Sequence, residues 1–246
     1  MIPLTKNFAH RGFSGKFPEN TMLAFEKAVE AGCDGIELDV QLSKDGVPVV
    51  IHDENTGRTT GRSGWVHDLT LDELRKLDAG KGSDAALGPL RIPALEEYFA
   101  YIRDKDIVTD IELKDSVFRY DGIEEKVIGL IRKYGVAEKV IFSSFNHQSM
   151  QLCKKLCPAI PCAFLTSDWL VGAGAYAHRR GVEFINPLFP FLTEENIREL
   201  RENGIRAMAW TVDLEKWMKR LAEHGVSAVI TNRPDLFRKV LDSLGH

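Results

Sequence analysis

Residues 35–53 read GIELDVQLSKDGVPVVIHD, and the first eight of them predict a strand with two different faces. Because side chains alternate across a strand, Glu37 and Asp39 share one face. The opposite face is apolar and carries Ile36, Leu38 and Val40. We expect the apolar face to pack against helices, so the two acids would point into the interior of a closed sheet.

The second half of this stretch predicts a return strand. Asp45-Gly46 separates two apolar-rich runs and is a strong signal for a two-residue hairpin turn. With these residues as the turn, counting back along both strands places Asp39 opposite His52. The hairpin would therefore carry His52 back to the acids.

Outward from this stretch, short β-branched runs alternate with helical patterns, which is typical of βαβ units around a parallel sheet. Eight strands are predicted, at Asn7–His10, Gly35–Leu42, Ile107–Lys114, Lys139–Ser143, Cys162–Leu165, Phe184–Asn186, Arg206–Val212 and Ala228–Thr231. A helix is expected after each, at Thr21–Ala31, Leu95–Arg103, Ile123–Tyr134, Gln148–Leu156, Trp169–Arg180, Glu194–Asn203, Leu214–Glu223 and Pro234–Leu244.

Eight such pairs in 246 residues predict an α/β fold of the (β/α)8 TIM-barrel type, which usually needs about 250 residues. We expect one catalytic domain over residues 1–246. The alternative is an open doubly wound sheet, but no Gly-rich phosphate-binding fingerprint follows the first strand.

One segment interrupts the alternation. Residues 53–93 are rich in Gly, Thr, Asp and Arg and are predicted to form a small insertion above the barrel mouth. Residues 68–80 within it, DLTLDELRKLDAG, predict one short helix. The apolar side chains of Trp65–Leu77 either pack on the barrel rim, which we favour, or form a platform for a lipid.

The composition is that of an ordinary globular protein, with 44% hydrophobic residues and a net charge of −4. The sequence has no basic patch of the kind that would predict binding to nucleic acid. No apolar run approaches the ~18 residues of a membrane span, and the start lacks the apolar run of a signal peptide. We therefore expect a cytoplasmic location, with the four cysteines reduced and buried.

Polar residues gather at the predicted strand ends, where the chemistry of a TIM barrel is found. Glu37, Asp39 and Glu112 would converge at this mouth and repel one another unless a cation lies between them. Three hard oxygen donors suit Mg²⁺ or Ca²⁺ better than Zn²⁺. The competing interpretations are a solvated acidic pair on the second strand and a structural ion pair between Glu112 and Lys114.

The two histidines next to these acids, His10 and His52, suit proton transfer near neutral pH. A cation together with Arg11 and Lys114 would stabilise negative charge that develops on a phosphoryl group. Phosphodiester cleavage is the reaction that this set favours, and sugar isomerisation is the chemical alternative. Arg11 favours the former, because guanidinium binds phosphate oxygens in bidentate geometry.

A set of motifs in this order resembles the glycerophosphodiester phosphodiesterases of the PLC-like phosphodiesterase superfamily. The motifs are AHRG-x5-PENT-x3-F from Ala9, the stretch quoted above, RTT at 58–60, IELK at 111–114, AWTVD at 209–213 and ITNRPD at 230–235. The resemblance covers nearly the whole chain. It implies a TIM barrel with a short insertion, one divalent cation, and hydrolysis of glycerophosphodiesters to sn-glycerol 3-phosphate and an alcohol.

The resemblance also implies a role for each matched residue. His10 and His52 correspond to the acid–base pair, and Glu37, Asp39 and Glu112 correspond to the metal ligands. The residues implied for substrate binding are Arg11 and Lys114 at the phosphate, Trp210 beside the glycerol moiety, and Glu19 and Asn20 of the PENT motif.

Two other functions stay open at this stage. One is a lysophospholipase D or phospholipase D-like activity on lipid substrates, and the other is a non-catalytic protein that binds glycerophosphodiesters. The expected partner is a small-molecule glycerophosphodiester, with no nucleic acid and no integral membrane segment. The sequence leaves open the head-group preference, a homo-oligomeric state and the division of acid and base roles between the histidines.

Overall fold

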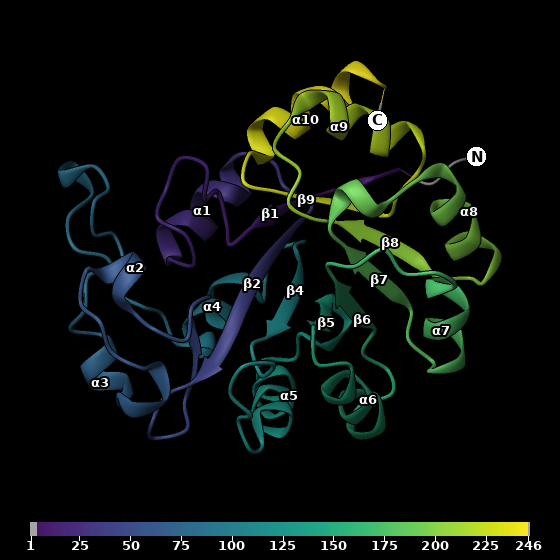
Figure 1. The fold of residues 1–246 in the computed structure, drawn as a ribbon. Coiled ribbons are helices and arrows are strands. Elements are labelled where there is room, and N and C mark those ends of the chain that lie inside the picture. Colours follow the sequence, from purple (N-terminus) through teal and green to yellow (C-terminus); the bar gives the residue numbers. More distant parts are fainter. Residues whose placement is uncertain (1–3, 246) are drawn as a thin grey trace.

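The computed structural model describes residues 4–245, which form a closed barrel of parallel strands (Figure 1). β1 pairs with both β2 and β9, so the sheet closes and the open doubly wound alternative is wrong. The barrel strands are β1 (Lys6–His10), β2 (Gly35–Leu42), β4 (Val108–Leu113), β5 (Val140–Ser144), β6 (Cys162–Thr166), β7 (Phe184–Pro187), β8 (Arg206–Ala209) and β9 (Ala228–Thr231). The predicted TIM barrel is confirmed.

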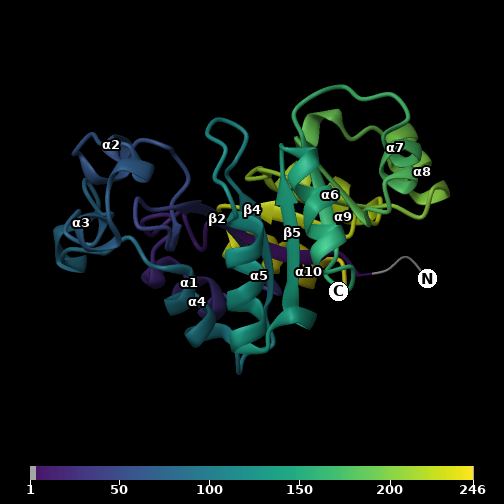
Figure 2. The same cartoon turned by 90° about the horizontal axis from the view of Figure 1, so that it is seen from below.

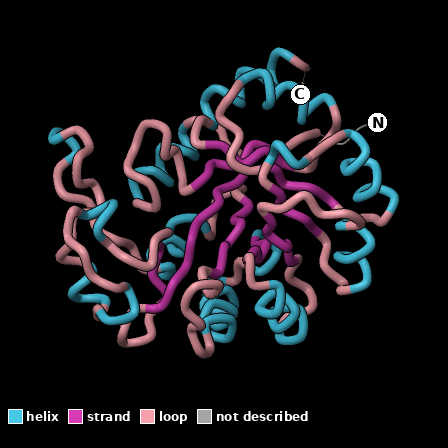
Figure 3. Tube along the Cα trace, viewed as in Figure 1, coloured by secondary structure: helices cyan, strands magenta, loops and turns pink. Residues whose placement is uncertain are grey.

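Helices surround the strands on the outside of the barrel (Figures 2 and 3). They are α1 (Met22–Glu30), α4 (Leu95–Ile102), α5 (Ile123–Tyr134), α6 (His147–Leu156), α7 (Ala173–Arg179), α8 (Glu194–Glu202), α9 (Glu215–Glu223) and α10 (Pro234–Ser243). α7 begins at Ala173 rather than at the predicted Trp169. Gly172, with φ of 69°, precedes it in the left-handed conformation, which ends the loop and starts the helix.

The apolar residues form two layers on either side of the barrel wall. Ile36, Leu38 and Val40 point outward into the layer between sheet and helices, as their alternation with the acids predicts. The inner layer closes the lower end of the barrel and consists of Phe8, Ile141, Ala163, Phe184, Met208, Ala228 and Ile230, which we call the apolar plug. The chemistry of the barrel is therefore confined to its upper half.

The hairpin after β2 exists, but its register differs from the prediction by one residue. β3 (Pro48–Val50) pairs so that Val40 faces Val50, and the Ile51 amide donates to the Asp39 carbonyl at 3.0 Å. Ile51, and not His52, is therefore opposite Asp39. Three residues form the loop instead of two, because Gly46 has a φ of 75° and adds a left-handed position after the turn.

The segment between β3 and α4 leaves the barrel and lies beside it, with α2 (Gly57–Thr60) and α3 (Leu71–Leu74) at the left of Figure 1. Two 3₁₀ turns, at Val66–Asp68 and Ala85–Leu87, complete it. Val66 and Leu74 are buried with Val49, Ile51 and Ile92 in a small core. They hold the segment to the hairpin, as the rim-packing interpretation expects, while Trp65 is half exposed.

Among residues 4–245, no helix is long and apolar enough to cross a membrane. The assignment of the whole chain to one catalytic domain with an insertion at 53–93 stays a prediction.

The packing of the apolar plug at the lower end of the barrel can be tested by a substitution at Gly35. A methyl group on Gly35 would lie 2.5 Å from the ring of Phe8, which the apolar plug holds in place. We expect Gly35→Ala to lower the free energy of unfolding by about 1–3 kcal/mol through overpacking. In chemical denaturation, Gly129→Ala on the exposed face of α5 serves as the control, with open space around it and a gain of up to about 1 kcal/mol expected. Equal effects of the two substitutions would contradict this account of the floor.

Candidate active site

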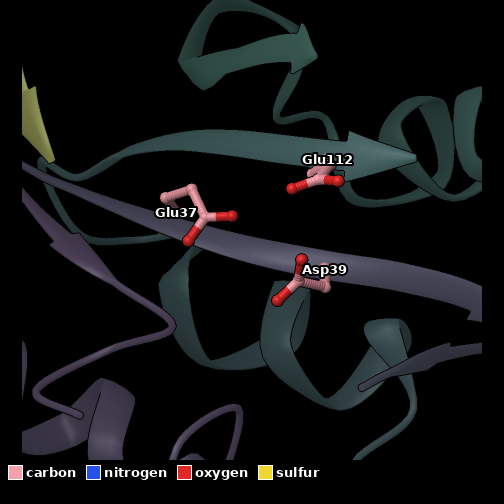
Figure 4. A group of neighbouring side chains, drawn as sticks. All are labelled: Glu37, Asp39 and Glu112. Atoms are coloured by element: carbon pink, nitrogen blue, oxygen red, sulfur yellow. The ribbon is translucent and has the colours of Figure 1, made fainter. Parts of the chain in front are cut away.

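Three acids face one another at the mouth of the barrel (Figure 4). Glu37 and Asp39 come from β2, and Glu112 comes from β4, where it lies directly across from Asp39. All three are buried, and each offers one carboxylate oxygen within 4.8 Å of the others. The inward direction follows from the alternation along each strand, because the residues between them pack against the outer helices.

Burial and mutual repulsion shift the ionisation of these acids in different directions. Burial raises the pKa of Glu37 well above its usual range, and the charges of Asp39 and Glu112 raise it further. Burial also raises the pKa of Glu112, to about 7. For Asp39, the cations Arg11 and Lys114 outweigh burial and hold its pKa below the usual range. A divalent cation between the three would remove the repulsion.

Asp39 is surrounded by four residues that the sequence analysis identified, namely Arg11, Asn20, Glu112 and Lys114. The Asn20 amide donates to Asp39 Oδ2 at 2.8 Å, and Arg11 Nε lies 3.3 Å from the same oxygen. Lys114 Nζ donates to Glu112 Oε1 at 2.8 Å. Arg11 and Asn20 have φ values of 54° and 56°, and the backbone N–H of Asn20 donates to the Arg11 carbonyl at 3.0 Å, which ties these two turns together.

His10 is held in place by a chain of hydrogen bonds from the loops after the neighbouring strands β9 and β8. Its Nδ1 lies 2.7 Å from Asn232 Oδ1, and Asn232 Nδ2 in turn donates to Asp213 Oδ2 at 2.7 Å. Its Nε2 is 3.9 Å from Glu37 Oε2. Burial, with the nearby charge of Arg11, lowers the pKa of His10 to about 4, so its ring is neutral at pH 7.

His52 lies on the opposite side of the acids and has a different set of partners. Lys114 Nζ is 3.2 Å from its Nε2, and Asp53 Oδ1 is 2.7 Å from its Nδ1. Arg58 binds Asp53 and Glu19 together, with four hydrogen bonds of 2.6–3.0 Å. This network links the segment after β3 to the PENT loop. It also fixes Asp53, which in turn positions the ring of His52.

Four supporting residues were not among the predicted site residues: Asp213, Asn232, Asp53 and Arg58. Each lies in one of the quoted motifs, namely AWTVD, ITNRPD, the end of the opening stretch, and RTT. In the sequence, their position within these motifs was the signal that could have indicated a functional role. Their partners, however, are up to 222 residues away in the sequence, so the contacts themselves needed the tertiary structure.

A cavity of about 230 Å³ opens between the two histidines. Arg11, Glu37 and Glu112 form its charged wall, and Phe145, Leu165 and Trp210 form an apolar wall. Trp210 is anchored by a hydrogen bond of 2.7 Å from its Nε1 to the Asn186 carbonyl. The ring of Phe145 meets that of Trp210 edge to face at 5.7 Å. The cavity thus combines ionic groups with a flat apolar surface.

The donor set fits a hard divalent cation. Asp39 Oδ1 and Asn20 Oδ1 are buried and have no hydrogen-bond partner among the described residues, although both lie at the acid cluster. Unpartnered buried oxygens are rare, and oxygen is the donor that Mg²⁺ and Ca²⁺ prefer. Glu37, Asp39 and Glu112 could therefore hold such an ion, with Asn20 close by.

Comparison with known proteins agrees with this geometry. A sequence model of the glycerophosphoryl diester phosphodiesterase family matches residues 10–236. The chain is 46% identical to the uncharacterized protein YqiK of Bacillus subtilis, over 94% of this chain and 96% of that protein. It is 44% identical to a glycerophosphodiester phosphodiesterase of Caldanaerobacter subterraneus, over 92% and 93% of the two chains.

A solved structure extends the comparison to a bound product. It is an Oleispira antarctica phosphodiesterase in complex with sn-glycerol-3-phosphate, which superposes with a TM-score of 0.87 over 97% of both chains at 28% identity.

The acid cluster leads to a test that does not depend on activity. Mg²⁺ or Ca²⁺ should raise the melting temperature over that in EDTA, since an ion at one hundred times its Kd adds about 2.7 kcal/mol to stability. Glu37→Gln should be at least as stable in EDTA, because a repelling charge is gone, and should lose most of the metal-induced rise. Asp104→Asn, at an exposed position, is the control and should keep it. An unchanged rise in Glu37→Gln would exclude the acid cluster as the metal site.

Proposed function

The chain belongs to the glycerophosphoryl diester phosphodiesterase family, and from this premise we propose that it hydrolyses glycerophosphodiesters to sn-glycerol 3-phosphate and an alcohol. The observation that carries the proposal is the cavity lined by His10, His52, Arg11, Glu37 and Glu112, with Asp39 and Lys114 paired directly to these lining residues. The product bound to the related Oleispira antarctica enzyme is consistent with it.

Glu37, Asp39 and Glu112 would hold the metal, with Mg²⁺ and Ca²⁺ as the two candidates. When bound, a divalent cation supplies Lewis-acid stabilisation of negative charge on phosphate oxygens. Arg11 and Lys114 add fixed positive charge on either side of the same acids. Because both are held by carboxylates, their charged groups are positioned before the substrate enters.

The histidines are proposed as the acid–base pair. One histidine takes the proton from the attacking hydroxyl, which belongs either to the glycerol moiety or to a water. The new phosphorus–oxygen bond forms while the bond to the leaving alcohol breaks, and the other histidine gives its proton to that alcohol. Attack by water yields sn-glycerol 3-phosphate directly. Attack by the glycerol hydroxyl yields a cyclic phosphodiester, which a water, deprotonated by the second histidine, then opens to sn-glycerol 3-phosphate while the first histidine returns its proton to the glycerol oxygen. The separate partners of the two rings, Asn232 for His10 and Asp53 for His52, support distinct roles.

The apolar wall suits the remainder of the substrate. Trp210 and Phe145 present ring surface to the cavity next to the charged wall, as the hydrocarbon part of glycerol requires. This wall also leaves lysophospholipids as an alternative substrate class. A purely binding function is disfavoured, because both histidines line one cavity together with Glu37 and Glu112 of the acid cluster.

Removing either ring should disable the reaction. We expect His10→Ala and His52→Ala each to lower kcat for glycerophosphocholine by roughly 10²–10⁴-fold, the usual contribution of general acid–base catalysis. His178→Ala, at the outer end of α7, should retain full activity. The metal-induced rise in melting temperature should persist in every variant. Its persistence would show that the variant is folded. Full activity in either ring variant would contradict the two-histidine mechanism.

Metal dependence is tested separately with a panel of head groups. Release of glycerol 3-phosphate from glycerophosphocholine, glycerophosphoethanolamine and glycerophosphoglycerol should stop in EDTA. It should return on addition of Mg²⁺ or Ca²⁺, since the buried acids otherwise repel the phosphate. Turnover that continues in EDTA after exhaustive dialysis would show that the reaction needs no metal.

A further inference from the structure

A second cavity lies at the lower end of the barrel, on the side of the apolar plug that faces away from the acids. Its volume is about 290 Å³, compared with about 230 Å³ for the cavity between the two histidines. Its lining residues come from the starts of the barrel strands and from the loops before them. Among residues 4–245, the two cavities share no lining residue. We call this second space the lower cavity.

The inner wall of the lower cavity is apolar. It is formed by the underside of the apolar plug, with Phe8, Ile141, Phe184 and Met208, all of them buried. The interior of a TIM barrel is usually filled by packed side chains. Here the packing leaves a concave apolar surface that is open to one side. Since an apolar cavity of about 150 Å³ can hold a benzene molecule, the lower cavity has room for a short hydrocarbon chain.

A cation lies at the edge of this apolar surface. Arg206 is the first residue of β8, and its guanidinium carbon is 3.8 Å from the centre of the Phe184 ring. Among residues 4–245, no carboxylate pairs with it. Glu183, whose charge acts on Arg206, is paired with Lys154 Nζ at 2.6 Å and accepts from the Cys162 amide. The guanidinium is therefore held in place by stacking, with its N–H groups free to bind an anion.

The other charged groups at the edge show on which side an anion would bind. Lys6 Nζ lies 3.3 Å from Asp34 Oδ1, and Arg238 Nη2 lies 3.2 Å from Asp34 Oδ2, so these three groups neutralise one another in part. Asp106 precedes β4, and the strand order places β4 across the barrel from β8. The edge is thus positive at Arg206 and negative on the opposite side. Arg206 balances one negative charge, which is the charge of a carboxylate.

We propose that the lower cavity binds a short amphiphilic carboxylate, with its carboxylate group on Arg206 and its hydrocarbon chain against the apolar plug. A guanidinium binds a carboxylate through two parallel N–H···O bonds. The Phe184 ring keeps the guanidinium beside the apolar wall, so one ligand can contact both. This site goes beyond the proposed function, because it uses none of the acids or histidines at the upper mouth.

Calorimetric titration of the full chain with octanoate tests the proposal. EDTA is present, so that no metal at the acid cluster can bind the carboxylate. We expect saturable binding of one octanoate per chain. Binding of 1-octanol should be at least about tenfold weaker, because it lacks the charge that pairs with Arg206. Acetate, which lacks the chain, should show no measurable binding. Absence of saturable octanoate binding would overturn the proposal.

Variants of Arg206 test the source of the affinity. Arg206→Met keeps an unbranched chain over Phe184 but removes the charge, and it should weaken octanoate binding by roughly 10–100-fold while changing that of 1-octanol by less than about threefold. Arg206→Lys should lie between the two. Arg198→Met, at an exposed position on α8, is the control and should bind octanoate as the unaltered protein does. Equal losses for octanoate and 1-octanol would give Arg206 a structural role only and would overturn the proposal.

Met208 reports where octanoate binds. Its side chain lines the lower cavity, whereas Met150 and Met218 are buried in the layer between sheet and helices. In a protein with ¹³C-labelled methionine methyl groups, octanoate should shift the Met208 resonance and leave those of Met150 and Met218 unchanged. Met208→Leu identifies the resonance. Octanoate binding without a shift at Met208 would place the ligand elsewhere and overturn the proposal. None of these measurements uses turnover, so a failure of the proposed function would not alter them.

Discussion

The electrostatic repulsion among three buried carboxylates is the constraint on which the upper half of this barrel depends. Glu37, Asp39 and Glu112 are brought together by the parallel pairing of β2 with β4, and among residues 4–245 the cations Arg11 and Lys114 pair with them. Arg11 and Lys114 stabilise the ionised form of Asp39, whereas the pKa values of Glu37 and Glu112 stay raised. The mouth is therefore prepared for additional positive charge, which suits a metal and the phosphate that it would bind.

The histidines depend on residues outside this cluster. Asp213 and Asn232 hold His10 from the loops after β8 and β9, whereas Arg58 and Asp53 hold His52 from the segment after β3. A βα loop can change in sequence without altering the barrel, but these loops are tied to one another by side-chain hydrogen bonds, which are half-buried at Asn232 and exposed at Arg58. The orientation of each ring is thus set by contacts between loops that follow neighbouring strands.

Beneath the acids, the barrel separates chemistry from stability along its axis. The apolar plug fills the lower end and contributes to the packing, and the hydrogen bond from Asn186 to Asp110 lies between it and the charged mouth. Asp110, Ser143 and Ile230 line the cavity from the barrel strands β4, β5 and β9, so its depth is set by the fold itself rather than by the loops.

Local patterns in the sequence determined the strands, the inward direction of Glu37, Asp39 and Glu112, and the order of the motifs. Alternation with Ile36, Leu38 and Val40 was enough for this, since a period of two assigns every side chain of a strand to a face. The register of the hairpin was wrong by one residue, because the left-handed Gly46 lengthens the loop and Asp-Gly alone does not specify that. The networks around His10 and His52, and the bond from Asn186 to Asp110, were decided only by the tertiary structure. They join residues that are far apart in sequence, and closure of the barrel is what brings such residues within hydrogen-bonding distance.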